Sequence, residues 1–164
     1  MRITPARATH LPELSALMGA SPLLGRYGVT RASARASLAE GLRARDLLLL
    51  GVERGEIVGV AWIVITRALD RAAYLRLLLV AEGWQRRGVG AALLQDAERR
   101  VRRSGSRHMI LLVTTTNRRA RSFYRRVGYR KVGDLPDFAR AGISESMYVK
   151  TFPRRVRAGK RARA

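Results

Sequence analysis

The feature that most constrains this chain is a glycine-bearing loop between a strand pattern and a helix pattern. The apolar run from Ala73 to Val80 predicts a strand, and the loop Gln85 to Gly90 follows it closely. A helix ending near Ser104 is predicted next, because apolar residues recur four positions apart at Val89, Leu93, Ala97 and Val101. A strand, a glycine loop and a helix in this order form a unit typical of an α/β sheet.

The start of this helix suits a phosphate. The first N–H groups of a helix lack backbone partners, and the helix dipole adds partial positive charge there. Gly88 and Gly90 carry no Cβ, so a ligand can lie against the backbone. Arg86 and Arg87 add donors that match phosphate oxygens. The same Gly-x-Gly pattern also fits an ordinary strand–turn–helix junction, and this alternative stays open on the loop alone.

Two common phosphate loops are excluded by the spacing. The chain contains no Gly-x-x-x-x-Gly-Lys-Ser/Thr sequence. Leu93 stands where the dinucleotide pattern requires its third glycine. The loop therefore fits neither a Walker nucleotide site nor a Rossmann dinucleotide turn.

The charge is the unusual part of the composition. The formal net charge is +21, and only three of the 33 basic residues are lysines (Lys131, Lys150 and Lys160). The electrostatic field of a protein with this charge concentrates anions such as phosphates, coenzymes and RNA. Residues 153–164 carry six basic side chains and no acidic one, which predicts a disordered basic tail with nonspecific nucleic-acid contact.

Length and residue usage exclude several classes of protein. The 164 residues are 47% hydrophobic, which suits one domain with one core. No apolar run is long enough to span a membrane, and the N-terminus lacks a secretory apolar segment. Because cysteine is absent and the two histidines lie far apart, we expect no disulfide and no metal site. A soluble cytoplasmic protein is the resulting expectation.

Strand and helix patterns alternate through the middle of the chain, between Tyr74 and Tyr129. This order predicts an α/β sheet with at least one parallel strand pair. Asp134 to Gly142 is expected to be a loop, because it contains Pro136. The predicted strands are residues 2–8, 47–52, 57–66, 73–80, 109–115, 129–133 and 145–152, and the predicted helices are residues 11–18, 30–43, 89–104 and 117–127.

The order of the predicted strands and helices, together with the motifs on them, resembles the GCN5-related N-acetyltransferase (GNAT) superfamily, as a small bacterial member. Three motifs carry the resemblance: the loop Gln85 to Gly90 after a strand, Asn117-x-x-Ala120-x-x-Phe123-Tyr124 before Gly128-Tyr129, and the opening Arg7-Ala8-Thr9. The resemblance covers residues 2–152 and implies one domain of mixed α/β class. Its sheet would be splayed and mostly antiparallel, with one parallel strand pair and about four flanking helices.

The resemblance also implies acetyl-CoA as cosubstrate. The strand backbone before the loop would hydrogen-bond the pantetheine arm, the loop N–H groups would hold the pyrophosphate, and an asparagine at the next helix start would reach the pantetheine. The coenzyme-binding residues implied in this way are Leu78, Leu79, Val80, Arg86, Arg87, Gly88, Val89, Gly90, Ala91 and Asn117. Asn117 is also compatible with an ordinary helix cap.

Tyr124 is the catalytic residue that the resemblance implies. It follows Asn117 by seven residues, which is about two helical turns on nearly the same face. Its phenol would lie near the sulfur and act as general acid when coenzyme A leaves as a thiolate. The alternative interpretation is a core aromatic beside Phe123.

The sequence identifies no general base. Glu82 and Glu145 are candidates, although the sequence favours a surface carboxylate over a base for each of them. Leu112 stands where acetylases of ribosomal-protein N-termini carry glutamate, which counts against that activity. Without cysteine no cysteinyl acetyl-enzyme can form, so direct attack in a ternary complex is expected.

The acceptor is expected to contact Gly19 to Gly28, the strand of Trp62 and Asp134 to Gly142. Few acidic residues occur in these segments, which disfavours polyamines and histone-like basic peptides and favours an acceptor bearing a carboxylate or phosphate. Three hypotheses follow. They are N-acetylation of a small amine, N-acetylation of an aminoacyl-RNA or protein, and a non-enzymatic module that binds nucleic acid or coenzyme. A homodimer is a further expectation.

Overall fold

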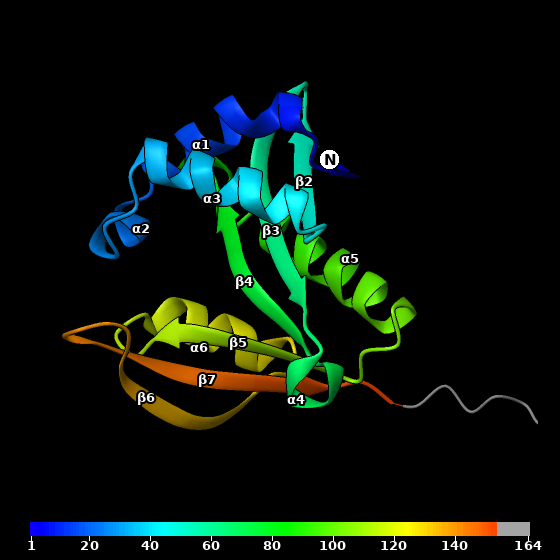
Figure 1. Cartoon of the computed structure of the whole chain (residues 1–164), viewed down its shortest axis with the longest axis vertical. Helices are drawn as coiled ribbons and strands as arrows, with labels where there is room; N and C mark the ends of the chain where they lie inside the picture. The colour runs from blue at the N-terminus through cyan, green and yellow to red at the C-terminus, as the bar shows by residue number, and fades with distance from the viewer. Residues whose placement is uncertain (154–164) are drawn as a thin grey trace, which may run out of the picture.

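The computed structural model describes residues 1–153, which form one seven-stranded sheet with helices on both faces (Figure 1). The strands are β1 (Arg2–Pro5), β2 (Leu47–Glu53), β3 (Glu56–Ile65), β4 (Ala73–Val80), β5 (His108–Thr114), β6 (Arg130–Arg140) and β7 (Ile143–Thr151). The helices are α1 (Leu11–Gly19), α2 (Pro22–Arg26), α3 (Arg31–Arg43), α4 (Ala68–Arg71), α5 (Val89–Arg103) and α6 (Arg118–Arg126), with short 3-10 turns η1 (Ala8–His10) and η2 (Glu82–Trp84). The predicted basic tail lies, after Pro153, outside the described residues.

The predicted fold class is confirmed. The strand order is β1-β2-β3-β4-β5-β7-β6, and β4 with β5 is the parallel pair among the described strands. The four predicted helices are α1, α3, α5 and α6, while α2 and α4 are short additions within predicted connections.

The prediction of a loop at residues 134–142 was wrong. β6 continues to Arg140, and the turn into β7 is short. β6 is the edge strand of the sheet, and its pairing with β7 is irregular between Leu135 and Arg140. Pro136 lies in this irregular stretch, where no ladder hydrogen bond from its nitrogen is required. Proline therefore indicated a loop in a place where an edge strand tolerates it.

The sheet opens into a V between β4 and β5. These strands pair only over Ala73–Leu75 and Met109–Leu111, and they diverge beyond those residues. Ile63 pairs with Leu75 and Trp62 with Leu77, which leaves Arg76 as an extra residue on β4. Such a bulge bends its strand, and here it lies where the divergence begins. We call β1–β4 the N-terminal arm and β5, β7 and β6 the C-terminal arm (Figure 1).

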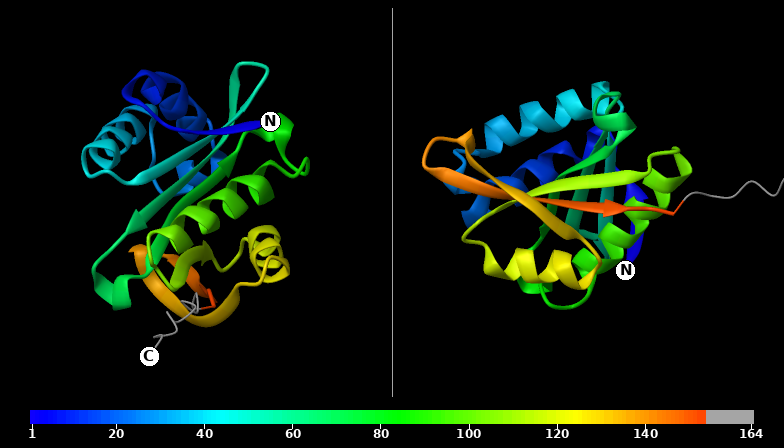
Figure 2. Two further views of the ribbon diagram at one scale, coloured as in Figure 1. Left: turned by 90° about the vertical axis from the view of Figure 1, so that its right-hand side faces the viewer. Right: turned by 90° about the horizontal axis from the view of Figure 1, so that it is seen from below.

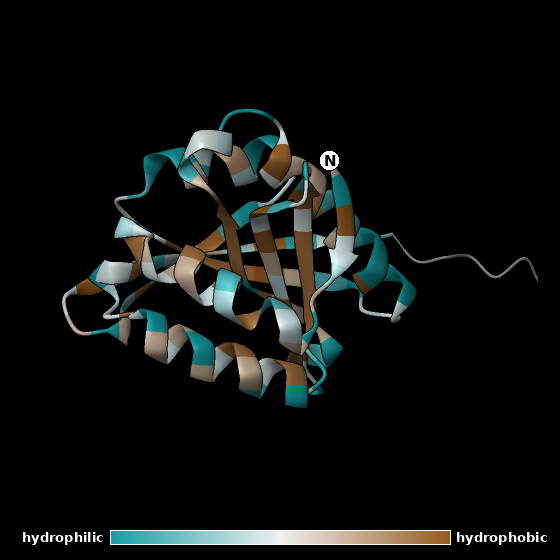
Figure 3. Ribbon diagram, turned by 90° about the horizontal axis from the view of Figure 1, so that it is seen from above, coloured by the Kyte–Doolittle hydropathy of each residue, from teal (hydrophilic) through white to brown (hydrophobic). Residues whose placement is uncertain are grey.

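Helices cover the two faces of the sheet in pairs (Figure 2). α1 and α3 pack on one face, in a cluster that includes Leu14, Leu38 and Trp62. α5 and α6 pack on the other, in a cluster that includes Leu93 and Tyr124. The strands between them are apolar and the outer helix faces are polar (Figure 3). Both faces of the N-terminal arm are thus buried, which explains the continuous apolar runs in β2 and β3.

α3 is held close to β3 by one aromatic contact. The Trp62 indole N–H donates to Asp46 Oδ2 at 2.7 Å. A Cβ at Gly41 would lie 2.5 Å from the indole, so only glycine fits beneath the ring at this position of α3. This close approach fixes one wall of the cavity described next.

Candidate active site

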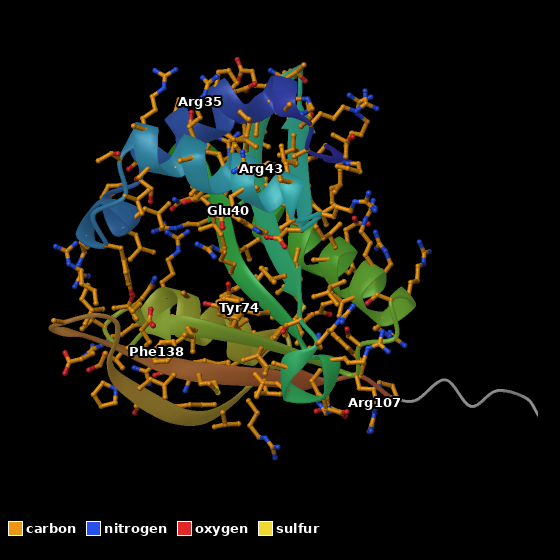
Figure 4. All side chains as sticks on the ribbon, in the orientation of Figure 1. Arg35, Glu40, Arg43, Tyr74, Arg107 and Phe138 are labelled. Carbon is orange, nitrogen blue, oxygen red and sulfur yellow. The ribbon has the colours of Figure 1, made fainter. Side chains whose placement is uncertain are left out.

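A cavity of about 420 Å³ lies in the V of the sheet. Tyr74 on β4 is one of its lining residues and lies between the two arms (Figure 4). The diverging strands contribute Leu77 and Leu78 from β4 and Leu112 and Thr114 from β5. Because residues of α1 and α3 line it together with residues of α6, the cavity extends through the gap between the strands from one face of the sheet to the other.

The edge of β4 beyond Leu75 is open toward the C-terminal arm. Leu78, Leu79 and Val80 pair with β3 only, since the pairing with β5 has already ended. The Val80 carbonyl accepts a hydrogen bond from the Gln85 side-chain amide at 3.3 Å. The predicted pantetheine strand thus has an unpaired edge, and the loop folds back onto its last carbonyl.

The glycine loop has the backbone shape of an anion site. Arg86 and Gly88 both have left-handed φ values, +64° and +82°. Gly88 is the N-cap of α5 and supplies no side chain to cap the helix, so the N–H groups of Val89, Gly90 and Ala91 have no capping acceptor. Concave backbone of this kind, at the start of a 15-residue helix, favours a phosphate.

The arginine side chains at the loop are exposed. The Arg87 guanidinium lies 5.3 Å from the centroid of the Trp84 ring, a cation–π contact that orients it. Gln85 accepts a hydrogen bond from Arg119 of α6 at 2.8 Å. The loop is therefore tied both to the end of β4 and to α6.

Asn117 is the N-cap of α6. Its Oδ1 accepts a hydrogen bond from the Ala120 N–H at 3.0 Å. Asn117 also lines the cavity. Because the cap uses only the carbonyl oxygen, the side-chain NH₂ stays available to donate to a ligand carbonyl.

Tyr124 is buried, with 8% of its surface exposed, and it lines the cavity on the α6 side. Its ring packs edge-on against Phe123 and Tyr129, with centroids 5.1 and 5.6 Å away. Within residues 1–153 its hydroxyl makes no hydrogen bond. Burial raises the pKa of Tyr124 above the ordinary value for a phenol, so the hydroxyl keeps its proton at neutral pH. Tyr124 is thus a core aromatic that also lines the cavity, and this position is compatible with both interpretations.

One interpretation of the sequence placed Glu145 on the surface, but the structure buries it. It is 6% exposed on β7 and lines the cavity on the side opposite α6. Its Oε1 accepts a hydrogen bond from the Tyr27 hydroxyl at 3.0 Å, and that hydroxyl lies 2.6 Å from Thr114 Oγ1. Burial, followed by the neighbouring Glu145, raises the pKa of Tyr74 in the same cavity. Tyr27 lies in the segment Gly19 to Gly28 that was expected to contact the acceptor, but its contacts with Glu145 and Thr114 were not predictable, because only the tertiary fold brings these residues together.

The three segments expected to meet the acceptor all reach the cavity. Tyr27 comes from the first segment, Trp62 from β3, and Ala139 from β6 near the hairpin tip. The Arg140 guanidinium donates to the Arg26 carbonyl at 3.0 Å, which ties this tip to α2 on the open side of the V. Glu82 is exposed on η2 and does not line the cavity, so Glu145 is the candidate base that the fold brings to it.

No group of three or more His, Cys, Asp or Glu side chains in residues 1–153 is placed to hold a metal ion. No helix in the same residues is long and apolar enough to cross a membrane.

Solved structures share this fold over nearly the whole chain. An aminoglycoside 6′-N-acetyltransferase complexed with coenzyme A has a TM-score of 0.79 at 18% identity, with 94% of this chain and 99% of that chain covered. The ribosomal-protein-S18-alanine N-acetyltransferase from Escherichia coli has a TM-score of 0.77 at 19% identity, with 99% of each chain covered. A GNAT-family acetyltransferase from Streptococcus pneumoniae has a TM-score of 0.74 at 21% identity, with 93% and 99% covered. Identities this low establish the fold alone.

Sequence comparison identifies the family. No curated protein matches the chain significantly. The family model of the acetyltransferase (GNAT) domain matches residues 27–152, which include β4, the glycine loop, α6 and β7. The match spans well over half of the chain and includes both diverging strands, β4 and β5. The chain therefore belongs to the GNAT family of acetyltransferases.

Proposed function

We propose that this acetyltransferase transfers the acetyl group of acetyl-CoA directly to the amine of a small molecule. One observation carries the proposal: a single cavity joins the two faces of the sheet through the gap between β4 and β5. Two substrates can approach from opposite faces and meet in such a gap. Holding both in one geometry supplies the proximity that direct transfer requires.

The coenzyme belongs on the α5–α6 face. The N–H groups at the start of α5 would hold the pyrophosphate, from Arg86 to Ala91. The pantetheine arm would lie along the open edge of Leu78 to Val80, with the Asn117 amide donating to one of its carbonyls. The thioester would then reach Tyr124 at the wall of the cavity.

The reaction needs a neutral amine and a leaving thiolate. The amine nitrogen attacks the thioester carbonyl carbon and forms the C–N bond. The C–S bond then breaks, and its electron pair goes to sulfur. The Tyr124 hydroxyl donates a hydrogen bond or its proton to that sulfur. The nitrogen loses one proton to solvent, and solvent returns one proton to the thiolate or to the Tyr124 oxygen, so that an amide, coenzyme A and the starting enzyme result. The raised pKa of Tyr124 keeps this donor in its acid form.

A small acceptor fits the cavity better than a macromolecule. The acceptor side is bounded by α2 and the β6–β7 hairpin, which the Arg140–Arg26 contact joins. It is only part of a cavity of about 420 Å³ that also takes the end of the coenzyme, which favours a small acceptor. Relatives in fold are named for acceptors of both kinds, an aminoglycoside and a ribosomal protein. The macromolecular acceptor is therefore the second candidate, favoured by the net charge of +21.

Calorimetry with acetyl-CoA, followed by an acceptor screen that measures free thiol, tests the proposal. We expect coenzyme binding and thiol release with small primary amines. Absence of coenzyme binding at millimolar concentration would refute the enzymatic assignment. Binding of coenzyme together with turnover only on an aminoacyl-RNA or a protein N-terminus would replace the small acceptor by the macromolecular one.

A further inference from the structure

Glu145 is a buried carboxylate that lacks a cationic partner. It is 6% exposed, and no lysine or arginine nitrogen in residues 1–153 forms a salt bridge with it. Its Oε1 is bound by the Tyr27 hydroxyl, whereas Oε2 is buried and makes no hydrogen bond. This is unexpected in a chain with 33 basic and 12 acidic residues, where a basic neighbour is readily supplied.

Burial of an unpaired carboxylate is unfavourable. A buried charge is tolerated when it is paired and hydrogen-bonded, and an unsatisfied buried oxygen loses the free energy of its hydration. Such a group is retained where the missing partner arrives with a ligand. For Glu145 Oε2 that partner must donate hydrogen bonds, and a cation satisfies the charge as well.

The surroundings hold Glu145 in one orientation. β7 pairs with β5 so that Glu145 is opposite Thr114, and both side chains reach the Tyr27 hydroxyl, at 3.0 and 2.6 Å. Two of the three residues therefore lie on paired strands rather than on loops. A preorganised carboxylate of this kind is suited to binding a ligand group in a defined position.

The rest of the acceptor side is mostly apolar. Arg76 is the one basic side chain among the lining residues in the described chain, and its guanidinium is stacked on the Trp62 ring at 4.7 Å. Hydroxyl groups of Tyr27, Ser33, Ser37, Tyr74 and Thr114 also line the cavity, but Glu145 is the one carboxylate among the lining residues in the described chain. The second ammonium group of a polyamine would therefore lose hydration without gaining an anionic partner. The apolar lining residues on this side are Met18, Leu24, Val29, Trp62 and Leu77.

We propose that the Glu145 carboxylate binds the ammonium group of the acceptor before that group loses a proton and attacks, and that the acceptor is a small primary amine with an apolar body and a single amino group. The inference rests on the proposed function, which it makes specific. Tyr27 is a positioning residue here, because it acts on the acceptor through Glu145. The sequence favoured an acceptor that bears a carboxylate, and Arg76 could pair with one. Binding of the ammonium group at Glu145 does not require it.

The test measures binding rather than turnover. The protein saturated with coenzyme A is titrated with 2-phenylethylamine and with 2-phenylethanol, which differ in the cationic group. We expect the wild-type protein to bind the amine roughly tenfold to 10²-fold more tightly, as a charge-assisted hydrogen bond to a buried carboxylate would give. Glu145→Gln should remove this preference while coenzyme affinity stays unchanged. Glu56→Gln, at an exposed glutamate of the β2–β3 turn, is the matched control and should retain the preference.

A second variant covers the case in which Glu145→Gln does not fold. Tyr27→Phe removes the hydroxyl that orients Glu145 and should reduce the preference for the amine severalfold, with coenzyme affinity retained. An equal preference in wild type, Glu145→Gln and Tyr27→Phe would overturn the assignment of Glu145. Tighter binding of spermidine than of 2-phenylethylamine would overturn the apolar monoamine class.

The two proposals fail in different ways. If the wild-type protein does not bind coenzyme A, the proposed function fails. If coenzyme binds and 2-phenylethylamine is acetylated, yet Glu145→Gln keeps the preference for the amine over the alcohol, only the role of Glu145 is refuted.

Discussion

Replacement of Tyr124 by phenylalanine separates a catalytic role from a packing role. The ring remains in place, so its edge-on contacts with Phe123 and Tyr129 are kept. The hydroxyl that is lost makes no hydrogen bond within the described residues, so no protein partner is left unsatisfied. We therefore expect the free energy of unfolding to change by less than about 1 kcal/mol.

The effect on turnover should be larger. General acids contribute about 10²–10⁴-fold, and a thiolate leaves with less assistance than an alkoxide does. We expect kcat to fall roughly tenfold to 10²-fold, which corresponds to about 1.4–2.7 kcal/mol of barrier. kcat and kcat/KM should fall together, because the hydrogen bond strengthens only as charge develops on sulfur. Thiol release gives both constants, and calorimetry should show acetyl-CoA affinity within a few fold of wild type.

The pH dependence gives an independent check. A general acid works below its own pKa, and burial raises the pKa of Tyr124 above the ordinary phenol value of about 10. The wild-type kcat should therefore show no loss from Tyr124 ionisation between pH 7 and about 10. Tyr129→Phe is the matched control, since Tyr129 packs against Tyr124 but does not line the cavity. Wild-type kcat in Tyr124→Phe, with chemistry shown to limit the rate, would refute the catalytic role.

Four further predictions address the coenzyme site, the cavity wall and the tail. A Cβ at Gly90 would lie 3.5 Å from a methyl of Val80, so Gly90→Leu should fill the path along β4 and weaken coenzyme affinity at least tenfold in calorimetry; unchanged affinity in a folded variant would contradict the path. Asn117→Asp keeps the cap acceptor but loses the amide donor, so it should weaken coenzyme binding with little change in stability, whereas Asn117→Ala should also lose about 1 kcal/mol of stability in denaturant titrations. Gly41→Ala should destabilise by about 1–3 kcal/mol, because its Cβ meets the Trp62 ring at 2.5 Å; a wild-type melting temperature would show that the ring can move at no cost. Deletion of residues 153–164 should leave turnover of a small amine unchanged and weaken salt-dependent nucleic-acid binding in filter assays; loss of turnover would give the segment another role.

The sequence determined the local units of this protein. The strand from Ala73, the loop with Gly88 and the helix from Val89 were all predicted, and the structure has them at those positions. The position of Asn117 as the N-cap of the next helix was also predicted from the sequence. These features depend on residues within one or two turns of each other, so side-chain periodicity and backbone preference carry the information.

Some local signals misled because their meaning depends on the tertiary position. Pro136 indicated a loop but lies in an edge strand, where its missing N–H is tolerated. The sequence favoured a surface carboxylate at Glu145, which is in fact buried, because its neighbours in the sequence do not tell which face of β7 is covered. Only the placement of a strand in the sheet decides both cases.

Tertiary structure alone decided the site. The extra residue Arg76 became a bulge only in register with β3, and the V opens beside it. The Tyr27 hydroxyl contacts Thr114, which is 87 positions away in the sequence, and Glu145, which is 118 positions away. Contacts over such separations are set by the packing of whole arms of the sheet, and no pattern of neighbouring residues encodes them. The sequence therefore predicted the helix start at which we propose that the coenzyme phosphate binds, and the fold brought together the residues of the proposed acceptor side.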